Sequence, residues 1–431
     1  MTLMTRVSAI HPTHVADIVP AWAEVAPNRI ALLDSGKTWT YAALNDAIRK
    51  TAAWLTEAGK VRPGDRVMLV CENGASAVSL YFACLSLGAW PVIANAKLAD
   101  REVDEIREHS GARCIVLTVA ASPRAKAHAQ RLNATLADPA GYGSIAITAV
   151  NETTNPEPEF IDQAEDVAAL IYTSGTTGKP KGVMLTHNNL LFVADATARA
   201  RGLTPDDRVL ATLPMSHILG LTGVLLGTLY AGATVYLTSR FDPAFVLGAL
   251  KNDGLSVMIG APSLYALLAE YAERKNLIPI PAPKLRLMSS AGAPLDAATK
   301  ALAEKAFGQT LHNGYGITEC GPTISLTALD APRTDCAVGR ILPGIETRLV
   351  GAENKDAHAG EAGELWVKSR GVMKGYYRAP EETAAAVTNG WFHTGDLARI
   401  EDGNLFIVGR AKEMIIRFGF NVYPAEVEGV L

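Results

Sequence analysis

The amino-acid sequence predicts an α/β protein with two layered α/β subdomains, each with a mostly parallel sheet, and a smaller β-rich subdomain shaped as a distorted barrel. Short apolar runs alternate with helical patterns, and this alternation restarts after the polar, Pro-containing segment NETTNPEPEF at residues 151–160. Such alternation is typical of parallel strands joined by crossover helices. From about residue 325 onward the pattern changes to short, Gly-punctuated strands, which predicts the β-rich part.

The first α/β subdomain, residues 1–165, is predicted from three apolar runs with two helical patterns between them. The expected strands are residues 66–70, 90–94 and 113–119, and the expected helices are residues 75–87 and 99–110. The second subdomain, residues 166–324, repeats this order, with strands expected at 167–172, 208–214, 233–238, 255–260, 285–290 and 310–316. Helical patterns separate these strands from residue 188, at 218–230, at 245–251, after Pro262 and from Leu295.

One segment of the second subdomain, residues 218–239, contains no charged residue and is long enough to suggest a membrane span. Several glycines and the turn sequence YAGA interrupt it, and the β-branched run ATVYLT follows. This pattern favours a buried helix, a tight turn and a buried strand instead. In the β-rich subdomain, residues 325–411, we expect strands at 344–350, 363–369, 391–400 and 404–410.

Composition narrows the classes of partner. The 431 residues include 40 basic and 44 acidic side chains, for a formal net charge of −4, which gives no electrostatic reason to expect nucleic acid or an anionic membrane as partner. Small molecules are favoured. The five cysteines are scattered without a Cys-x-x-Cys pair, which argues against a disulfide framework or a zinc site. This cysteine usage, and an N-terminus without the apolar core of a signal peptide, lead us to expect a cytoplasmic protein with no membrane span.

The most informative segment is YTSGTTGKPKG at residues 172–182, which follows an apolar run. Glycines let backbone N–H groups converge on an anion, and hydroxyl and ammonium groups add donors, so the segment predicts a phosphate-binding loop. It is not a Walker A loop, because Thr173 stands where the first glycine belongs and Pro180 where the metal-binding hydroxyl belongs. A plain surface turn is the alternative interpretation.

This segment resembles the phosphate loop of the adenylate-forming superfamily, which contains acyl-CoA and aryl-CoA synthetases, firefly-type luciferases and peptide-synthetase adenylation domains. Five further motifs of the superfamily follow in the expected order: LPMSHILG (213–220), SSAGAPL (289–295), HNGYGITE (312–319), GWFHTGD (390–396) and GRAKEMIIRFGFNVYPAEVE (409–428). The resemblance spans nearly the whole chain. It implies a reaction in which a carboxylate attacks the α-phosphate of ATP and pyrophosphate leaves, so that positioning and charge stabilisation dominate catalysis.

The resemblance also implies the residues of an ATP and Mg²⁺ site. Lys181 would meet the leaving pyrophosphate, Thr318 the α-phosphate, and Glu319 would hold Mg²⁺, a cation that prefers oxygen ligands. The ring of Tyr315 would stack on adenine. The other residues implied in ATP or AMP binding are Thr173, Ser174, Gly175, Thr176, Thr177, Gly178, Ala291, Gly292, Ala293, Asn313, Gly314 and Gly316.

Near the C-terminal end, the resemblance implies that Asp396 and Arg410 hold the ribose hydroxyls and that Lys412 is a hinge. A large N-terminal domain would span residues 1–411, and residues 412–431 would be the hinge and the start of a C-terminal domain that is largely missing here. The superfamily's catalytic lysine would lie in that missing part. We therefore expect these 431 residues to bind ATP and the acid, to adenylate poorly, and not to complete the CoA step.

The acyl pocket is implied next to the carboxylate of the acid, with His217 as the residue that shifts between conformations. Ile218, Leu219, Cys320 and Gly321, together with Gly314 and Gly316, would form an apolar lining that suits a fatty or aromatic acid. The stretch SHILGLTG has no Asp to hold an α-amino group, which disfavours amino acids as substrates.

Taken singly, each motif has a plainer interpretation. Tyr315 could be a core tyrosine in a turn, and His217 a core histidine with satisfied hydrogen bonds. Glu319 could be a helix cap, Asp396 a turn residue, and Arg410 and Lys412 surface charges.

Together, the motifs predict an acid–thiol ligase of the AMP-forming acyl-CoA synthetase type, with ATP, Mg²⁺ and CoA as cofactor and co-substrates. Two alternatives stay open at this point: an acyl-adenylate ligase that loads a carrier-protein phosphopantetheine, and a non-catalytic nucleotide-binding module.

Overall fold

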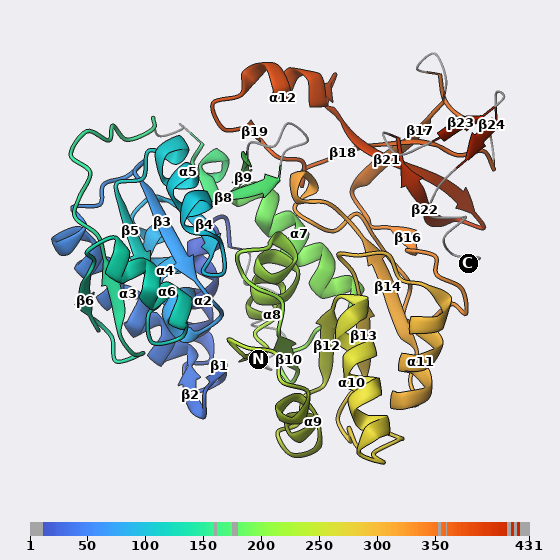
Figure 1. The fold of residues 1–431 in the computed structure, drawn as a ribbon, viewed down its shortest axis with the longest axis horizontal. Helices are drawn as coiled ribbons and strands as arrows, with labels where there is room; N and C mark the ends of the chain where they lie inside the picture. The colour runs from blue at the N-terminus through green and yellow to red at the C-terminus, as the bar shows by residue number, and fades with distance from the viewer. Residues whose placement is uncertain are drawn as a thin grey trace. The chain divides into compact units, whose positions relative to one another are not determined.

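The protein is an α/β protein, and the computed structural model describes residues 12–158, 162–174, 180–351, 355–358, 360–411, 415–417 and 420–422. It divides into two compact units: unit 1 comprises Met1–Ala198, Leu203–Phe241 and Met373–Arg378, and unit 2 comprises Arg199–Gly202, Asp242–Val372 and Ala379–Leu431. The ribbon is shown in Figure 1, and each unit is described below by itself.

Unit 1 contains an eight-stranded sheet in the order β19-β9-β8-β4-β3-β5-β7-β6. Its strands are β3 (Arg66–Cys71), β4 (Trp90–Asn95), β5 (Cys114–Leu117), β6 (Thr135–Ala137), β7 (Ile145–Ile147), β8 (Val167–Ser174), β9 (Pro180–Thr186) and β19 (Gly375–Tyr376). The central strands β8, β4, β3 and β5 are parallel, whereas the flanking pairs are antiparallel. All six residues of β3 are buried, as expected of a central parallel strand covered on both faces.

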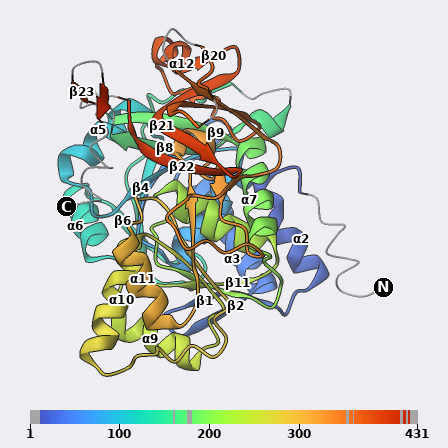
Figure 2. The same ribbon diagram turned by 90° about the vertical axis from the view of Figure 1, so that its right-hand side faces the viewer.

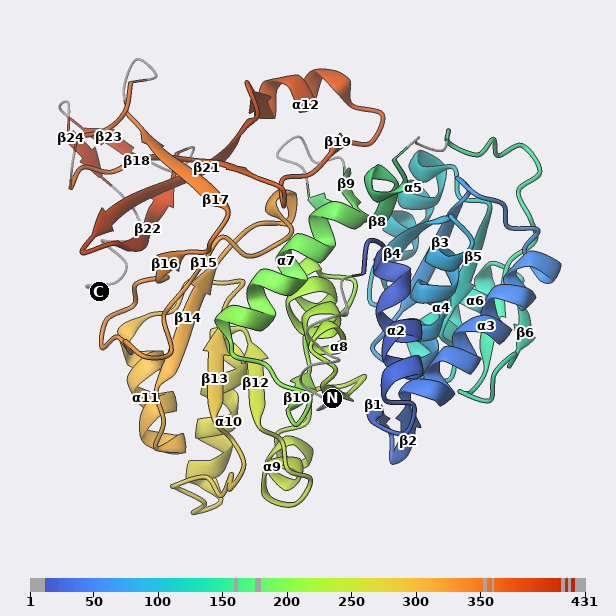
Figure 3. The same ribbon diagram turned by 180° about the vertical axis from the view of Figure 1, so that it is seen from behind.

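Helices cover this sheet. They are α4 (Ala75–Ser86), α5 (Asp100–Ser110) and α6 (Pro123–Arg131), and Figure 1 shows α5 and α6 in teal beside these strands. Two further helices are α2 (Ile18–Val25) and α3 (Tyr41–Ala58). Helix α3 packs against α4, and α2 packs against α3 (Figure 3). Helix α3 is capped by Thr40, whose hydroxyl accepts a hydrogen bond from the Ala43 N–H at 3.1 Å and so satisfies one free donor of the first turn.

A second group of strands in unit 1 runs in the order β10 (Arg208–Ala211), β11 (Thr234–Leu237), β1 (Ile30–Asp34) and β2 (Lys37–Thr40). The uncharged segment at residues 218–239 forms a π-helical stretch (Leu219–Leu226), helix α8 (Gly227–Tyr230), a turn and strand β11, in agreement with a buried helix, turn and strand. In the part of the chain that the structure describes, no helix combines the length and the apolar character that crossing a membrane requires.

Unit 2 has its own strand group in the order β16-β15-β14-β13-β12. Strands β12 (Val257–Gly260), β13 (Leu287–Ser290) and β14 (Leu311–Tyr315) are parallel, and β15 (Ser325–Leu326) and β16 (Arg340–Ile341) continue antiparallel. The helices of this group are α9 (Pro243–Asn252), α10 (Pro262–Arg274) and α11 (Ala297–Phe307). Helix α11 is capped at its start by Asp296, whose carboxylate accepts from the Thr299 N–H at 2.7 Å, and at its end by Gly308 in the left-handed conformation.

The β-rich part of unit 2 is a five-stranded antiparallel sheet. It contains β17 (Ile345–Val350), β18 (Gly363–Ser369), β20 (Val387–Thr388), β21 (Trp391–Glu401) and β22 (Asn404–Arg410), and helix α12 (Pro380–Ala386) precedes β20. Figure 2 shows β21 and β22 in red, running side by side. A separate two-stranded pair, β23 (Ile415–Arg417) and β24 (Phe420–Val422), lies later in the chain. The two parallel-containing sheet groups and this curled antiparallel sheet confirm the predicted fold class.

The main difference from the sequence-based expectation is strand β9. The segment at 172–182 was expected to be a loop before a helix, but its two ends belong to strands, with Thr173 opposite Lys181 in an antiparallel hairpin. The start of β9 was not recognised from the sequence because Pro180 and Gly182 are residue types that are uncommon in strands. The subdomain bounds at residues 165 and 324 stay a prediction, although the eight-stranded sheet takes strands from both sides of residue 165.

Candidate functional site

Two of the predicted motifs follow adjacent parallel strands of unit 2. Strands β13 and β14 are in register, with Ser290 opposite Asn313. Their carboxyl ends therefore meet at one edge of the sheet, the edge where open α/β sheets bind ligands. Residues Ala291, Gly292 and Ala293 directly follow β13; Ala291 is buried, and the other two are exposed.

Close packing explains the glycines around Tyr315. A Cβ atom added to Gly314 would lie 2.4 Å from Leu326 Cδ2, and one added to Gly316 would lie 1.4 Å from the carbonyl oxygen of Pro322. Asn313 is buried, and its side chain donates to the Cys336 carbonyl at 3.1 Å and accepts from the Gly314 N–H at 3.0 Å. The backbone that carries Tyr315 is thus fixed from several sides.

The structure brings Tyr315, Asp396 and Arg410 together. The Tyr315 hydroxyl donates to Asp396 Oδ2 at 2.5 Å, and Arg410 Nε donates to Asp396 Oδ1 at 3.2 Å. The Asp396 side chain is only 7% exposed, whereas that of Arg410 is 64% exposed. Burial, and next the negative charge of Asp396, raise the pKa of Tyr315 well above its usual value, so its hydroxyl stays protonated and available as a donor.

The sheet holds Asp396 in place. Asp396 lies in β21 directly opposite Arg410 in β22. Its own N–H donates to the hydroxyl of Thr394 at 3.0 Å, and that hydroxyl donates to the Leu365 carbonyl of β18 at 2.7 Å. A buried carboxylate on a rigid strand, with each oxygen in a hydrogen bond, is suited to receive hydroxyl donors in a fixed geometry.

Thr318 and Glu319 lie in a single 3-10 turn, Thr318–Cys320, which ends at Gly321 in the left-handed conformation. Cys320 is buried, and burial raises the pKa of its thiol well above the usual value; the charges of Glu319 and Asp396 raise it further. Both carboxylates therefore act electrostatically on the same buried thiol. In the described residues no group of three or more His, Cys, Asp and Glu side chains could hold a metal ion, so Glu319 offers one carboxylate rather than a protein cage.

In unit 1, the two described ends of the phosphate-loop segment belong to the paired strands β8 and β9. Thr173 and Ser174 are the last residues of β8, and Lys181 is the second residue of β9. Gly175, Thr176, Thr177 and Gly178 lie outside the described residues, as does Lys412. The Lys181 ammonium lies 5.1 Å from the ring centroid of Tyr376 in β19.

The predicted acyl residues of unit 1 lie at the start of the π-helical stretch. Ile218 and Leu219 are buried, and the His217 ring accepts the Leu219 N–H at Nδ1, at 3.2 Å. His217 keeps an exposed part, yet neighbouring protein atoms lower its pKa below the usual value by desolvation. Its Nδ1 atom is thus an acceptor on a neutral ring, which leaves Nε2 to carry the proton.

Some residues around the hairpin were not anticipated from the sequence. The hydroxyl of Tyr172 and the Nδ1 atom of His109 share a hydrogen bond at 2.7 Å, and strand β19 lies next to β9. The aromatic pair in MKGYYR was the available signal for β19. Two adjacent aromatic residues after a glycine do not by themselves indicate which strand they join.

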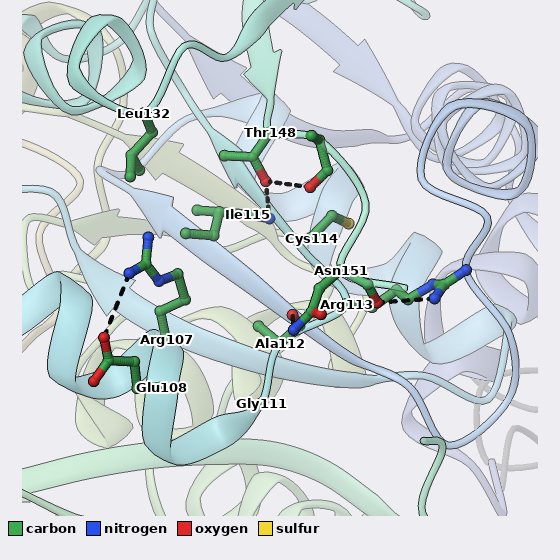
Figure 4. A pocket seen from close by; sticks show the side chains of 11 residues that line it. Arg107, Glu108, Gly111, Ala112, Arg113, Cys114, Ile115, Leu132, Thr148 and Asn151 are labelled. Carbon is green, nitrogen blue, oxygen red and sulfur yellow. Dashed lines mark hydrogen bonds and ion pairs between the residues drawn. The ribbon is translucent and has the colours of Figure 1, made fainter. Parts of the chain in front are cut away.

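A cavity of about 340 Å³ also lies in unit 1, between the end of α5, the start of β5 and residues 148–151 (Figure 4). None of the predicted site residues lines it. Two of its polar groups are engaged with the backbone: Thr148 Oγ1 accepts from the Ile115 N–H, and the Nη1 atom of Arg113 donates to the Asn151 carbonyl. We assign it no role in the site.

Comparisons with known proteins show the family to which the chain belongs. Residues 19–377 match the family model described as "AMP-binding enzyme". The chain is 36% identical over 420 residues to a protein of Amycolatopsis sp. named feruloyl-CoA synthase, covering 95% of this chain and 81% of that protein.

Two solved structures are similar over most of their length. One is ATP-bound MatB from Rhodopseudomonas palustris, with a TM-score of 0.83, 29% identity, and coverage of 97% of this chain and 82% of that one. The other is O-succinylbenzoate coenzyme A synthetase from Bacillus subtilis in complex with ATP and magnesium ion, with a TM-score of 0.80, 30% identity, and coverage of 96% of this chain and 83% of that one. The chain therefore belongs to the AMP-binding enzyme family, among its acyl-CoA and aryl-CoA ligases, and is an AMP-forming acid–thiol ligase.

Proposed function

We propose that this protein activates a hydrophobic carboxylic acid, fatty or aromatic, as an acyl-adenylate at the expense of ATP and transfers the acyl group to CoA. The observation that carries the proposal is the Tyr315–Asp396–Arg410 arrangement. An aromatic ring, a buried carboxylate and a guanidinium group together match a nucleoside: the ring can stack on adenine, and the carboxylate can accept from ribose hydroxyls.

The residues that follow Tyr315 suit the polyphosphate. Thr318 offers a hydroxyl donor for the α-phosphate. Mg²⁺ is commonly bound through one or two carboxylates plus substrate phosphates, which fits the single carboxylate of Glu319 in this turn. When bound, the ion would neutralise charge on the phosphate oxygens. Lys181 would supply a positive charge for the leaving pyrophosphate.

The acyl group is proposed to meet an apolar lining. Ile218 and Leu219 are buried in unit 1, and Cys320, which precedes Gly321, is buried in unit 2. These side chains offer no charge for an α-amino group, which supports a fatty or aromatic acid over an amino acid. The neutral ring of His217 would lie near the acid's carboxylate.

A binding test examines this proposal without requiring turnover. Hydrolysis-resistant acyl-sulfamoyl adenosines, one with a medium-length fatty chain, one with a hydroxycinnamoyl group and one with an aminoacyl group, are titrated against the protein by calorimetry. The proposal expects tight binding of the fatty or the hydroxycinnamoyl compound, competition by ATP, and much weaker binding of the aminoacyl compound. The proposal would be contradicted if none of the three compounds bound at a site from which ATP displaces it.

A second assay tests the acceptor. Thioester formation is measured on the intact enzyme with the preferred acid, ATP and Mg²⁺, and either free CoA or a phosphopantetheinylated carrier protein. The proposal expects product with free CoA. Product with the carrier protein alone would replace CoA by a protein-bound thiol as the acceptor.

A further inference from the structure

The segment Met373–Arg378, which we call the 373–378 strap, is far along the chain from the phosphate-loop hairpin, yet belongs to unit 1 with it. Its strand β19 pairs antiparallel with β9, with Tyr376 opposite Val183 and Gly375 opposite Met184. Two backbone bonds extend this pairing, because the Lys374 N–H donates to the Met184 carbonyl at 3.0 Å and the Tyr377 N–H donates to the Gly182 carbonyl at 2.7 Å. The strap therefore adds a strand to the hairpin along residues 182–184 of β9.

The strap is anchored independently of Tyr376. The Tyr377 hydroxyl donates to Glu157 at 2.5 Å, and the Tyr377 ring packs edge-on against Trp90. Arg378 donates to the His109 carbonyl at 3.0 Å and lies over the ring of Tyr377. These contacts fix the backbone on the C-terminal side of Tyr376 without any contribution from the contact between its ring and Lys181.

The ring of Tyr376 meets the side chain of Lys181. The ammonium lies 5.1 Å from the ring centroid, within the range of a cation–π contact. Lys181 itself is held in β9 opposite Thr173. An ammonium group has three N–H donors, so a ring that engages one side of it leaves the others available for phosphate oxygens.

We propose that Tyr376 is a positioning residue for Lys181, and that its ring holds the lysine ammonium ready for the polyphosphate of ATP. A lysine side chain loses considerable rotamer freedom when it is fixed, so orienting it in advance lowers the entropic cost of binding phosphate. The inference rests on the proposed function, in which Lys181 meets the pyrophosphate. It predicts that Tyr376 matters for the phosphates of ATP and not for its nucleoside.

The test compares dissociation constants for ATP and for adenosine, measured by calorimetry on wild type and on the Tyr376→Leu and Tyr376→Phe variants. For Tyr376→Leu we expect ATP binding weakened about two- to fivefold, the size of an exposed cation–π contact, with adenosine binding unchanged. Tyr376→Phe keeps the ring face and should bind ATP like the wild type. The matched control is Tyr271→Leu, which removes a similar contact with Lys275 at 5.8 Å on helix α10 and should change neither constant.

Two further measurements separate positioning from general support of the fold. In a Lys181→Met background, Tyr376→Leu should cause no additional loss of ATP affinity. Replacing Tyr376 by phenylalanine and then by 3,4,5-trifluorophenylalanine keeps the shape of the ring and weakens only its attraction for cations, so it remains informative if the Leu variant folds poorly. ATP affinity should fall from the phenylalanine variant to the trifluorinated variant.

Each outcome decides the proposal. Equal ATP affinity for wild type, the Leu variant and the fluorinated variant would overturn the positioning role while leaving the proposed function intact. Equal losses for ATP and adenosine, or an undiminished effect in the Lys181→Met background, would also overturn it, because the role of Tyr376 would then be structural. A wild-type protein that binds neither ATP nor adenosine would overturn the proposed function, and this inference with it.

Discussion

Replacing Asp396 by asparagine should separate nucleotide binding from fold stability. The asparagine side chain has nearly the same shape and keeps one oxygen that can accept from Tyr315, but it loses the negative charge. The ion pair with Arg410 is a small loss, because Arg410 is 64% exposed and such pairs contribute about 0 to 1 kcal/mol. We therefore expect the free energy of unfolding of Asp396→Asn to stay within about 1 kcal/mol of the wild type.

The effect on ATP should be much larger. The carboxylate of Asp396 would accept hydrogen bonds from the ribose hydroxyls. Hydrogen bonds with one charged partner contribute about 1.5 to 3 kcal/mol. Losing that charge should raise the dissociation constant for ATP roughly 10- to 150-fold. Calorimetric titration of ATP and urea unfolding of the same preparation measure the two quantities.

The matched control is Asp356→Asn. Asp356 is 67% exposed and pairs with Arg348 at 2.8 Å in the same unit, so its replacement removes an ion pair of the same kind and should change neither quantity. If Asp396→Asn folds normally and binds ATP within about twofold of the wild type, the assignment of Asp396 to the ribose is wrong, because a charged acceptor should contribute more than that.

Three further predictions concern the contributions of Tyr315, Gly316 and His187 to the free energy of unfolding. Tyr315→Phe should lower the free energy of unfolding by about 1.5 to 3 kcal/mol in urea titrations, because buried Asp396 loses its hydroxyl donor; a stability equal to wild type would show that the 2.5 Å bond contributes nothing. Gly316→Ala should cost about 3 kcal/mol or more, since its Cβ would meet the Pro322 carbonyl, while Gly248→Ala in α9, with nothing within 4 Å, should be neutral or stabilising. Burial, and next the charge of His14, lower the pKa of His187 from 6.5 to about 3, so its contribution to stability is fully present above pH 6.5 and is lost as the pH falls toward 3. Between pH 6.5 and about 4.5 the wild type should therefore lose about 2 to 3 kcal/mol more than His187→Gln, and parallel pH profiles would contradict this.

The sequence by itself determined the alternating elements and the places of the motifs along them. The run at residues 66–70 is a strand because it is apolar after Arg66, and the structure extends it only to Cys71. The run at 363–369 and strand β18 have the same bounds. These segments were predictable because a strand that is buried on one or both faces has an alternating or continuous apolar pattern in its own sequence.

The candidate site was predictable only in part, for a related reason. The glycines around Tyr315 mark a position where the backbone must pass close to other chain segments, and this local signal is readable. That Asp396 lies near Tyr315 was implied by resemblance alone, because the two residues are 81 positions apart and no local pattern encodes their contact.

The tertiary structure decided which strands pair. Strand β9 carries Pro180 and Gly182, and its identity comes from hydrogen bonds to β8 rather than from its own propensities. The 373–378 strap is the clearest case, since its pairing with β9 joins segments about 190 residues apart. Hydrogen-bond partners across such a separation depend on the whole fold, so only the assembled structure places the ring of Tyr376 beside the ammonium of Lys181.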